Sequence, residues 1–599
     1  MDKGRILKRL QNILSISPQL KKIFMSMHTV DEKRKKIRDF LTKLFIDTFG
    51  ADPNIPPMEY MLSQDAITTF RKILMKRNEK LSGFSFIEYI NDLIHNPGKK
   101  GLEKPDPGFF AELEHMLKGI MGKTGIYPEK APAFAKYDGI KAARLRSADL
   151  SRLSRYAHKF MDSYPCGLDS EVKRRNIANK ARILKYFGAT ELEWENWKWH
   201  TRHIIRDAKT LGALLELNEG EDKAVRIAEK SKIPFGITPY YLSLMDNNPE
   251  NINAYVVRAQ VIPSLHYVNR LLEYKKSSET SMDFMLERDT SPIEGITRRY
   301  PMIAILKPIL TCPQICVYCQ RNWEIEDVYS VKAVLSKDKL DNALKWIAET
   351  PELNEILITG GDPFLLPNQK IENMLFKLSR IPHIKRIRLG TRTPITLPQR
   401  ITDSLVRDIN HFHHPGKREI LIVTHVEHPL EITPQVMNAV QKFRRLGMDV
   451  YNQMVYTFYN SRKFEAVVLR DKLRLVGITP YYTFNTKGKD ETYDFRVPIP
   501  RLLQEQKEEA RLLPGTVRTD EIVFNVPGLG KNYLRATQHH DVISILPSGC
   551  RVYEFHPWEK KLALANTYVY TDVSIYDYMQ RLKSIGEDLQ DYKTIWYYY

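Results

Sequence analysis

Residues 302–321 read MIAILKPILTCPQICVYCQR, an apolar run followed directly by three cysteines. The run is rich in aliphatic residues and predicts a buried strand. Similar runs begin at residues 355, 384, 419, 449 and 478, about thirty residues apart after the first gap, with helical patterns between them. This spacing is typical of βα units, which build parallel sheets. We therefore predict an α/β fold, an incomplete parallel (β/α)6 TIM-type barrel preceded by a mainly α-helical region, with its chemistry at the C-terminal ends of the strands.

The loop after the first predicted strand contains Cys312, Cys316 and Cys319, three of the five cysteines in the chain. Thiolates at this spacing can bind three irons of a [4Fe–4S] cluster, which normally has four cysteine ligands. The fourth iron is then open to a small molecule, and this is the signature of radical enzymes that use S-adenosyl-L-methionine. A zinc site would need a further cysteine or histidine nearby, and Cys166 and Cys550 are isolated. Zinc binding and structural packing are the alternatives.

Composition excludes some classes of protein. The chain has 599 residues, of which 43% are hydrophobic and 27% charged, as in soluble globular proteins. Five cysteines argue against a secreted disulfide scaffold. We see no apolar secretory signal and no apolar run long enough for a membrane span, and we therefore expect a cytoplasmic protein. The net charge of +19 is compatible with anionic partners, but the basic residues are dispersed, so we expect neither nucleic acid nor a membrane.

The sequence upstream of the barrel predicts helices. Thr29 and Glu32 have the spacing of a capping box ahead of a helical pattern. No catalytic constellation is evident before about residue 195, so this part is interpreted as packing or assembly. We predict four regions: 1–190, a helical extension of unknown role; 191–295, a helical segment leading into the barrel; 296–535, the barrel with its sites; and 536–599, a C-terminal segment.

Two further patterns are informative. The hexapeptide GITPYY occurs at 236–241 and again at 477–482, without the fixed period of a repeat architecture. The aromatic tail TIWYYY, residues 594–599, is expected to dock on its own barrel rather than on a partner subunit.

Long strings of this chain resemble the lysine 2,3-aminomutase family, radical enzymes that move an α-amino group to the β carbon. The resemblance covers roughly the last two thirds of the chain, and these strings are uncommon together. They are WENWKWHTRHIIRD (194–207), ITPYYLSLMD (237–246), RRYP (298–301), the cysteine loop, TGGDPFLL (359–366), RLGTRTPITLPQRIT (388–402), HVEHPLEIT (425–433), YNQ (451–453), PYYTF (480–484) and VPGLGK (526–531).

The resemblance implies three cofactors: a [4Fe–4S] cluster, S-adenosyl-L-methionine and pyridoxal 5'-phosphate. Lys531 matches the family's Schiff-base lysine, although its glycine loop is one residue shorter than expected; the alternative is a surface lysine in a turn. Arg321 matches the arginine that binds the substrate α-carboxylate, a role that suits a planar guanidinium; the alternative is an ordinary surface arginine. We expect an electron donor such as ferredoxin or flavodoxin.

Other positions also match family motifs. Gly360, Gly361 and Asp362 resemble the motif that holds the methionyl amino group through exposed backbone. Ile303 replaces the family arginine four positions after Arg299, so we expect the phosphate contact to be redistributed. Four side chains are expected to contact the cofactor phosphate or S-adenosylmethionine: Arg299, Tyr300, Arg392 and Gln453.

The resemblance also informs the substrate. Lysine-specific members place two aspartates against the terminal ammonium, and Lys487 and Asn525 occupy those positions here. Lys487 would repel an ammonium, whereas the pair would suit a carboxylate, as in glutamate 2,3-aminomutases. A register slip that leaves Lys487 in solvent is the alternative.

We therefore interpret the chain as an intramolecular aminotransferase, an isomerase, that acts on L-glutamate. The alternatives are L-lysine or a related amino acid as substrate, or a radical enzyme that modifies a macromolecule. The family's zinc-binding cysteines are missing, since Cys550 is the only cysteine after Cys319. Assembly through zinc is therefore not assumed, and a homo-oligomer stays open.

Overall fold

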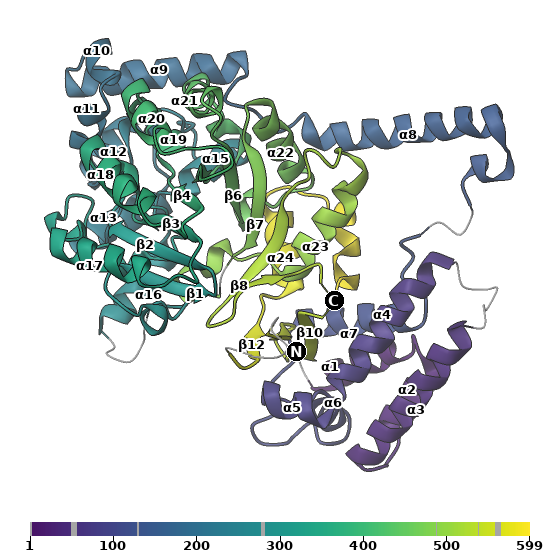
Figure 1. Ribbon diagram of the computed structural model, residues 1–599. Helices are drawn as coiled ribbons and strands as arrows, with labels where there is room; N and C mark the ends of the chain where they lie inside the picture. Colours follow the sequence, from purple (N-terminus) through teal and green to yellow (C-terminus); the bar gives the residue numbers. More distant parts are fainter. Residues whose placement is uncertain are drawn as a thin grey trace. The chain divides into compact units, whose positions relative to one another are not determined.

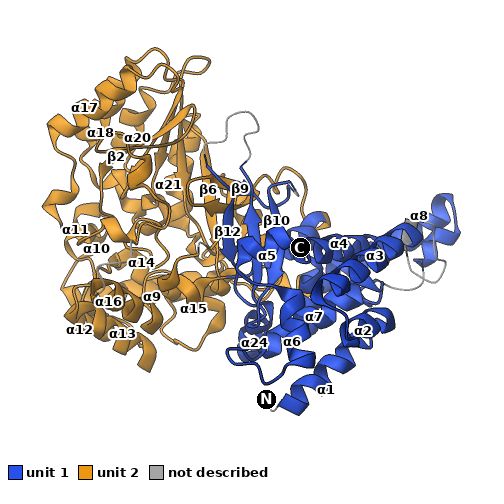
Figure 2. Ribbon diagram, turned by 90° about the horizontal axis from the view of Figure 1, so that it is seen from below, with its two compact units in different colours: residues 1–157, 497–510, 532–599 blue, residues 158–496, 511–531 orange. Residues whose placement is uncertain are grey.

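The computed structural model describes residues 3–49, 57–127, 131–276, 282–486, 488–536, 538–557 and 565–599. The chain divides into two compact units, coloured separately in Figure 2. Unit 1 comprises residues 1–157, 497–510 and 532–599, and unit 2 comprises residues 158–496 and 511–531. The predicted domain boundaries stay predictions. All predicted site residues fall within the ranges of unit 2.

Unit 2 is built on a mostly parallel sheet (Figure 1) whose strands follow one another in chain order. β1 (Ile296–Tyr300) runs antiparallel to β2 (Ile303–Ile309). All later neighbours up to β8 are parallel: β3 (Glu355–Gly360), β4 (Arg386–Gly390), β5 (Glu419–Thr424), β6 (Val450–Tyr456), β7 (Thr479–Asn485) and β8 (Glu521–Val526). The predicted α/β partial barrel is confirmed, and β8 extends it by one parallel strand. β9 (Gly530–Tyr533) lies next to β8 and carries the chain into unit 1.

Helices connect the strands of unit 2, as parallel strands require. Their bounds are α17 (Lys337–Ala348), α18 (Asn368–Ser379), α20 (Asp403–Asn410), α21 (Pro434–Arg445) and α22 (Glu465–Leu475). The first four are amphipathic and bury one apolar face; α21, for example, buries Val436, Val440 and Phe443. In α22 the first six residues, Glu465 to Arg470, are all buried. The connection between β7 and β8 instead passes through α23 (Ile499–Glu508), which belongs to unit 1.

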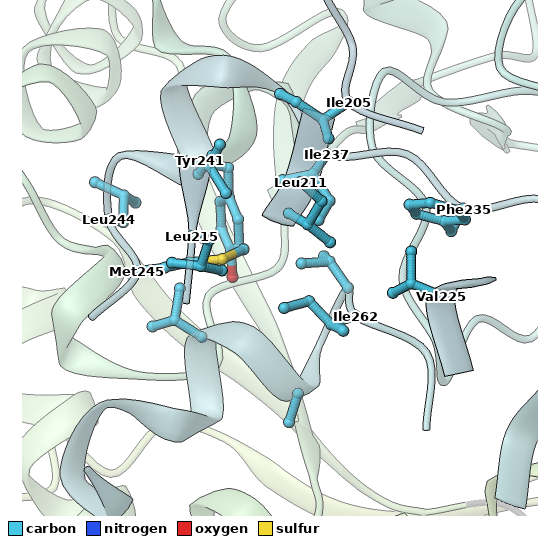
Figure 3. Close-up of a cluster of buried hydrophobic side chains, with 14 of the residues drawn as sticks. Ile205, Leu211, Leu215, Val225, Phe235, Ile237, Tyr241, Leu244, Met245 and Ile262 are labelled. Atoms are coloured by element: carbon cyan, nitrogen blue, oxygen red, sulfur yellow. The ribbon is translucent and has the colours of Figure 1, made fainter. Parts of the chain in front are cut away.

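A second apolar core lies in the helical segment ahead of the barrel (Figure 3). Its helices are α9 (Ser170–Phe187), α10 (Glu191–Trp194), α11 (Trp197–Arg202), α12 (Ala208–Leu214), α13 (Glu219–Lys230), α14 (Pro239–Leu242), α15 (Ile252–Ala259) and α16 (Leu265–Lys276). Leu211, Ile237 and Tyr241 are fully buried in this core, and Val317 of the cysteine loop packs into it. Burying a side chain of this size stabilises the fold by roughly 1.5–3 kcal/mol. The segment therefore supports the loop that carries the cysteines.

Unit 1 begins with helices, as predicted: α1 (Lys3–Leu14), α2 (Pro18–Met25), α3 (Val30–Phe49), α4 (Pro57–Ile73), α5 (Lys76–Ser82), α6 (Phe86–His95), α7 (Pro107–Ile120) and most of α8 (Gly139–Met161), whose last turn, from His158, is assigned to unit 2. The capping box is confirmed at the start of α3. The Thr29 N–H donates to Glu32 Oε2 at 2.8 Å, and the Glu32 N–H donates to Thr29 Oγ1 at 3.3 Å. Among the described helices, none is both long and apolar enough to cross a membrane.

The C-terminal part of unit 1 is a small antiparallel sheet, β10 (His540–Ile545), β11 (Arg551–Phe555) and β12 (Tyr568–Thr571), followed by α24 (Ile575–Ser584). Buried Arg551 donates to the carbonyls of Trp596 and Tyr598 at 2.7 and 2.6 Å and is paired with Glu112 of α7. The tail therefore docks on its own chain, as expected. The expectation that it docks on the barrel is wrong, because these partners belong to unit 1 and anchor the tail there.

Candidate functional site

A cavity in unit 2 brings the predicted site residues together. It extends from the inner face of the sheet to the loops that follow β3, β4 and β5. Lys487 lies outside the described residues. The other predicted residues all line the cavity: Arg299, Tyr300, Cys312, Cys316, Cys319, Arg321, Gly360, Gly361, Asp362, Arg392, Gln453, Asn525 and Lys531. Their individual roles stay predictions.

The cysteine loop is held by the helical segment. The Ile315 N–H donates to the Gly236 carbonyl at 3.0 Å, and the Val317 N–H donates to the Gln260 carbonyl at 2.8 Å. Within the described ranges, no three His, Cys, Asp or Glu side chains converge closely enough to hold a single metal ion. The ligands of a [4Fe–4S] cluster bind different irons and need not converge on one point.

Arg392 directs a guanidinium at one of the cysteine sulfurs. Its Nη1 donates to Cys316 Sγ at 2.6 Å, and its Nη2 donates to Glu431 Oε1 at 2.8 Å and contacts the Gln260 side chain. Burial raises the pKa of the Cys316 thiol to about 11, and the charge of Arg392 opposes that rise. A donor aimed at the sulfur fits a thiolate, the form that binds iron.

The glycine loop after β3 crosses closely over the start of the cysteine loop. The Gly361 N–H donates to the Ile309 carbonyl at 2.7 Å, and the Asp362 N–H donates to the Thr311 carbonyl at 2.9 Å. A Cβ atom on Gly361 would lie 2.1 Å from the Thr311 carbonyl oxygen, so only glycine fits this crossing.

The Asp362 carboxylate organises the neighbouring loop. It accepts four hydrogen bonds, from the Thr391 hydroxyl at 2.6 Å and from the backbone N–H groups of Arg392, Thr393 and Phe364 at 2.9–3.0 Å. These bonds join the loops that follow β3 and β4. A ligand at this loop would therefore meet backbone groups rather than an unpaired carboxylate.

Lys531 lies at another part of the cavity wall, between two aromatic rings. Its amine is 5.0 Å from the centre of the Tyr300 ring and 4.9 Å from that of Tyr482. Its backbone N–H donates to the Tyr300 hydroxyl at 3.1 Å. Burial, together with the positive charge of Arg388, lowers the pKa of the Lys531 amine to about 8. A neutral amine is the form that attacks an aldehyde, so this environment fits a Schiff-base lysine.

Arg321 is already engaged with a carboxylate of the chain. Both its Nε and its Nη2 lie 3.1 Å from the Glu287 carboxylate, and Arg299 and Lys307 approach the same group at 3.3 and 3.6 Å. Burial opposes ionisation of Glu287, but these cations outweigh it and lower its pKa to about 2. The predicted contact of Arg321 with a substrate α-carboxylate stays a prediction. No sequence signal pointed to Glu287.

Lys489 is a further cavity residue that the sequence analysis missed. Its Nζ lies 2.8 Å from Glu491 Oε1, 2.5 Å from Asn322 Oδ1 and 3.3 Å from the Cys319 carbonyl. It is two positions from Lys487, in the same Lys-Gly-Lys-Asp loop. The loop was therefore recognised, but not this lysine.

The chain matches known proteins in agreement with this site. Residues 306–469 match the model of the Radical SAM superfamily. An uncharacterized KamA family protein of Methanocaldococcus jannaschii is 42% identical, over 99% of this chain and 98% of its own length. The chain belongs to the KamA family. The resemblance expected from the sequence strings is thereby confirmed.

Other relatives of this KamA family protein match over shorter regions. The L-lysine 2,3-aminomutase of Bacillus subtilis is 35% identical over 30% of this chain and 35% of its own length. The glutamate 2,3-aminomutase of Clostridioides difficile is 33% identical over 33% of this chain and 43% of its own length. Each match thus spans less than half of the aminomutase. A solved structure of Streptococcus suis SuiB bound to S-adenosylmethionine has 13% identity and a TM-score of 0.28, over 52% of this chain and 67% of SuiB, a likeness too distant to bear on function.

Proposed function

We propose that this KamA family protein is a 2,3-aminomutase, an isomerase that moves the α-amino group of L-glutamate to the β carbon. The observation that carries the proposal is that the three-cysteine loop and Lys531 line one cavity. When bound, a [4Fe–4S] cluster with S-adenosylmethionine supplies radical chemistry, and pyridoxal phosphate supplies an electron sink. The chain's own residues bind and orient these groups and exclude water.

The residues present fit the cluster and S-adenosylmethionine. Cys312, Cys316 and Cys319 would hold three irons, and two hydrogen-bond donors already point at their sulfurs. These donors are the Arg392 guanidinium and the Arg321 N–H, which lies 3.3 Å from Cys319 Sγ. Backbone carbonyls of the glycine loop, which lines the cavity, would receive the methionyl amino group.

The residues near Lys531 fit pyridoxal phosphate. The amine of Lys531 would bind the aldehyde, and its lowered pKa, about 8, favours that reaction near neutral pH. Arg299 is buried beside this lysine, and its Nε has no hydrogen-bond partner among the described residues. Such an unused donor fits an anionic group of a ligand.

Arg321 would hold the substrate α-carboxylate. Among the described residues its guanidinium pairs only with Glu287 and Glu324. A substrate carboxylate would therefore enter a cluster in which Glu287 already fixes the orientation of the guanidinium. Hydrogen abstraction requires near-contact between carbon atoms, so this positioning matters to the rate.

The charges of the cavity wall favour an acidic side chain over an ammonium. Asp362 is the only Asp or Glu among the described lining residues, and its carboxylate already accepts four hydrogen bonds. The basic lining residues are Arg299, Arg321, Arg388, Arg392, Lys489 and Lys531, with His425 beside them. A lysine substrate would bring a further positive charge to this wall without a free counter-charge. The glutamate side chain would instead find the Asn525 amide and a cationic wall. Arg321, Arg392 and Lys489 of this wall are already paired with carboxylates that do not line the cavity, Glu287, Glu431 and Glu491.

We also propose the electron donor and the cellular compartment that were expected from the sequence. A ferredoxin or flavodoxin would reduce the cluster, and the enzyme would act in the cytoplasm. Neither partner nor compartment is needed for the assay below, because a chemical reductant can replace the protein donor.

An anaerobic assay tests the proposal. The reconstituted protein receives S-adenosylmethionine, pyridoxal phosphate, a reductant and either glutamate or lysine, and the β-amino products are measured by NMR. We expect β-glutamate from glutamate only, and no product from Lys531→Ala. Formation of β-lysine alone would overturn the substrate and leave the reaction class. Release of deoxyadenosine with isomerisation of neither amino acid would overturn the aminomutase and favour another radical reaction.

A paired variant tests the substrate assignment. Lys487→Asp combined with Asn525→Asp places carboxylates at the two positions where lysine-specific relatives have them. We expect the preference for glutamate over lysine to fall by at least tenfold in kcat/KM, because one like-charge contact is worth more than 1 kcal/mol in a partly buried site. An unchanged preference would show that these positions do not contact the side chain.

A further inference from the structure

Arg388 of β4 lines the cavity close to Lys531. Its side chain is only 8% exposed, and its charge is among the causes that lower the pKa of Lys531. Arg299 acts on the same amine in the same direction. Two buried guanidinium groups therefore lie within electrostatic reach of the lysine that would bind the cofactor aldehyde.

The register of the sheet relates Arg388 to Ile303. Ile303, Glu355 and Arg386 are direct neighbours across β2, β3 and β4. Arg388 follows two residues later on β4, and alternate residues of a strand share one face. Its Nε lies 2.5 Å from Glu355 Oε1, so the guanidinium reaches back toward the row that contains Ile303.

The Arg388 guanidinium retains hydrogen-bonding capacity. Its Nε is buried and lies 2.5 Å from Glu355 Oε1, but this contact does not have the geometry of a hydrogen bond. The side chain forms no hydrogen bond with any described residue. The Nε and Nη2 atoms of Arg299 are also buried and form no hydrogen bond with a described residue. Buried donors in native proteins are nearly always satisfied. Arg392 Nε in the same cavity also lacks a partner among the described residues, but Arg299 and Arg388 both act on the Lys531 amine, so their unused donors point to an anion bound beside that lysine.

We infer that Arg388 and Arg299 together bind the 5'-phosphate of pyridoxal phosphate, with Arg388 replacing the arginine that Ile303 does not provide. This inference rests on the proposed function, because it requires that pyridoxal phosphate binds at Lys531. A phosphate dianion matches two guanidinium groups in charge and in the geometry of their donors.

The competing explanation is structural. Arg388 could serve only to join β4 to β3 through Glu355, as Arg386 does: Arg386 Nη1 lies 3.1 Å from Glu355 Oε2, and its Nε lies 2.5 Å from Glu419 Oε2. Arg386 is half-exposed and is not among the cavity residues. It is therefore a matched control, since it shares the carboxylate but not the cavity.

The experiment compares pyridoxal phosphate with pyridoxal, which lacks only the phosphate ester. Binding of each to the anaerobically reconstituted protein is titrated by the visible absorbance of the protein-bound form. We expect Arg388→Gln to weaken pyridoxal phosphate binding by about 10- to 100-fold, the effect of one charge-assisted hydrogen bond. Binding of pyridoxal should change less than about twofold, and Arg386→Gln should leave both affinities unchanged.

Two further variants complete the test. Ile303→Arg in the Arg388→Gln background should restore at least part of the affinity for pyridoxal phosphate, because it places a cation in the row of the sheet toward which the Arg388 guanidinium reaches. Arg388→Lys keeps the charge, should lose less affinity than Arg388→Gln, and serves as the probe if the glutamine variant does not fold.

The outcomes separate the inference from the proposed function. If Arg388→Gln weakens pyridoxal and pyridoxal phosphate equally, Arg388 positions Lys531 rather than the phosphate, and the inference is wrong. It is also wrong if neither affinity changes, while the proposed function stands. If the unmodified protein binds neither compound, both the inference and the proposed function fail.

Discussion

The cavity has a cysteine end, at Cys312, Cys316 and Cys319, and a lysine end, at Lys531. The polar groups of the two ends differ in the hydrogen bonds that they form. At the cysteine end, Asp362 accepts four hydrogen bonds, and Arg392 donates from both Nη atoms to Cys316, Glu431 and their neighbours. At the lysine end, Arg299 and Arg388 retain buried donors without aligned partners among the described residues. At the cysteine end, Arg392 Nε and the Gln314 side chain are likewise buried without a hydrogen-bond partner among the described residues. This end nevertheless has the denser network of hydrogen bonds within the protein, whereas the donors at the lysine end are available to a ligand. Substitutions should therefore reduce stability at the first end and ligand binding at the second.

Arg392→Met should produce the largest loss of stability. The variant leaves Glu431, which is fully buried, without its cation. Removing one partner of a buried ion pair costs about 3–5 kcal/mol. We expect a lower denaturation midpoint and, after anaerobic reconstitution, a lower iron content per chain. An unchanged midpoint would contradict the view that this end is held together by Arg392.

Asp362→Asn should have a smaller effect in the same direction. The amide keeps the volume of the carboxylate but turns an NH2 group toward backbone N–H groups that now donate to it. We expect a cost of about 1–3 kcal/mol in unfolding free energy, the penalty for an unsatisfied buried donor. Thermal unfolding followed by circular dichroism measures it.

Lys531→Met is the matched control at the lysine end. Burial disfavours the charged form of the Lys531 amine. Replacing the amine by an apolar side chain should therefore leave the unfolding temperature the same or raise it, while isomerase activity is lost. Destabilisation as large as that of Asp362→Asn would remove the contrast between the two ends.

The barrel and the composition of the site could be predicted because they depend on local signals. Runs of apolar β-formers placed β2 to β7, and the C-terminal ends of parallel strands meet at one edge of a sheet. The cysteine loop after β2 and the glycine loop after β3 therefore had to approach each other. Lys531 was predicted from its resemblance to a family motif rather than from local structure.

Two features could not be predicted because they depend on contacts between residues that are far apart in the sequence. The hexapeptide GITPYY begins a helix in its first copy, where Thr238 caps α14 and accepts a hydrogen bond from the Tyr241 N–H. The second copy enters β7, because β6 and β8 supply hydrogen-bonding neighbours on both sides. Glu287 shows the same limit: its carboxylate acquires a role only because folding brings Arg321 and Arg299 around it.

The pH dependence of cofactor capture should report on the lysine end. The pKa of Lys531 is lowered to about 8, from about 10.5 for an ordinary lysine. Below pH 8 the amine is mostly protonated and cannot attack an aldehyde, and above pH 8 it is mostly neutral. The rate of pyridoxal capture by the reconstituted protein should therefore rise with pH, with a midpoint near 8. A midpoint near 10 would mean that the amine is solvated rather than buried.

The smallest expected effect sharpens the same measurement. Tyr300 and Tyr482 both place a ring about 5 Å from the Lys531 amine, and the face of an aromatic ring favours an ammonium over a neutral amine. Tyr482→Leu removes one ring and keeps an apolar contact, so the midpoint for pyridoxal capture should fall, by less than about one pH unit if the ring contributes about 1 kcal/mol. Tyr482→Phe retains the ring face and should leave the midpoint unchanged. A rise in the midpoint of the leucine variant would indicate that the ring shields the amine from water more than it stabilises its charge, and that burial at this end depends on Tyr482 itself.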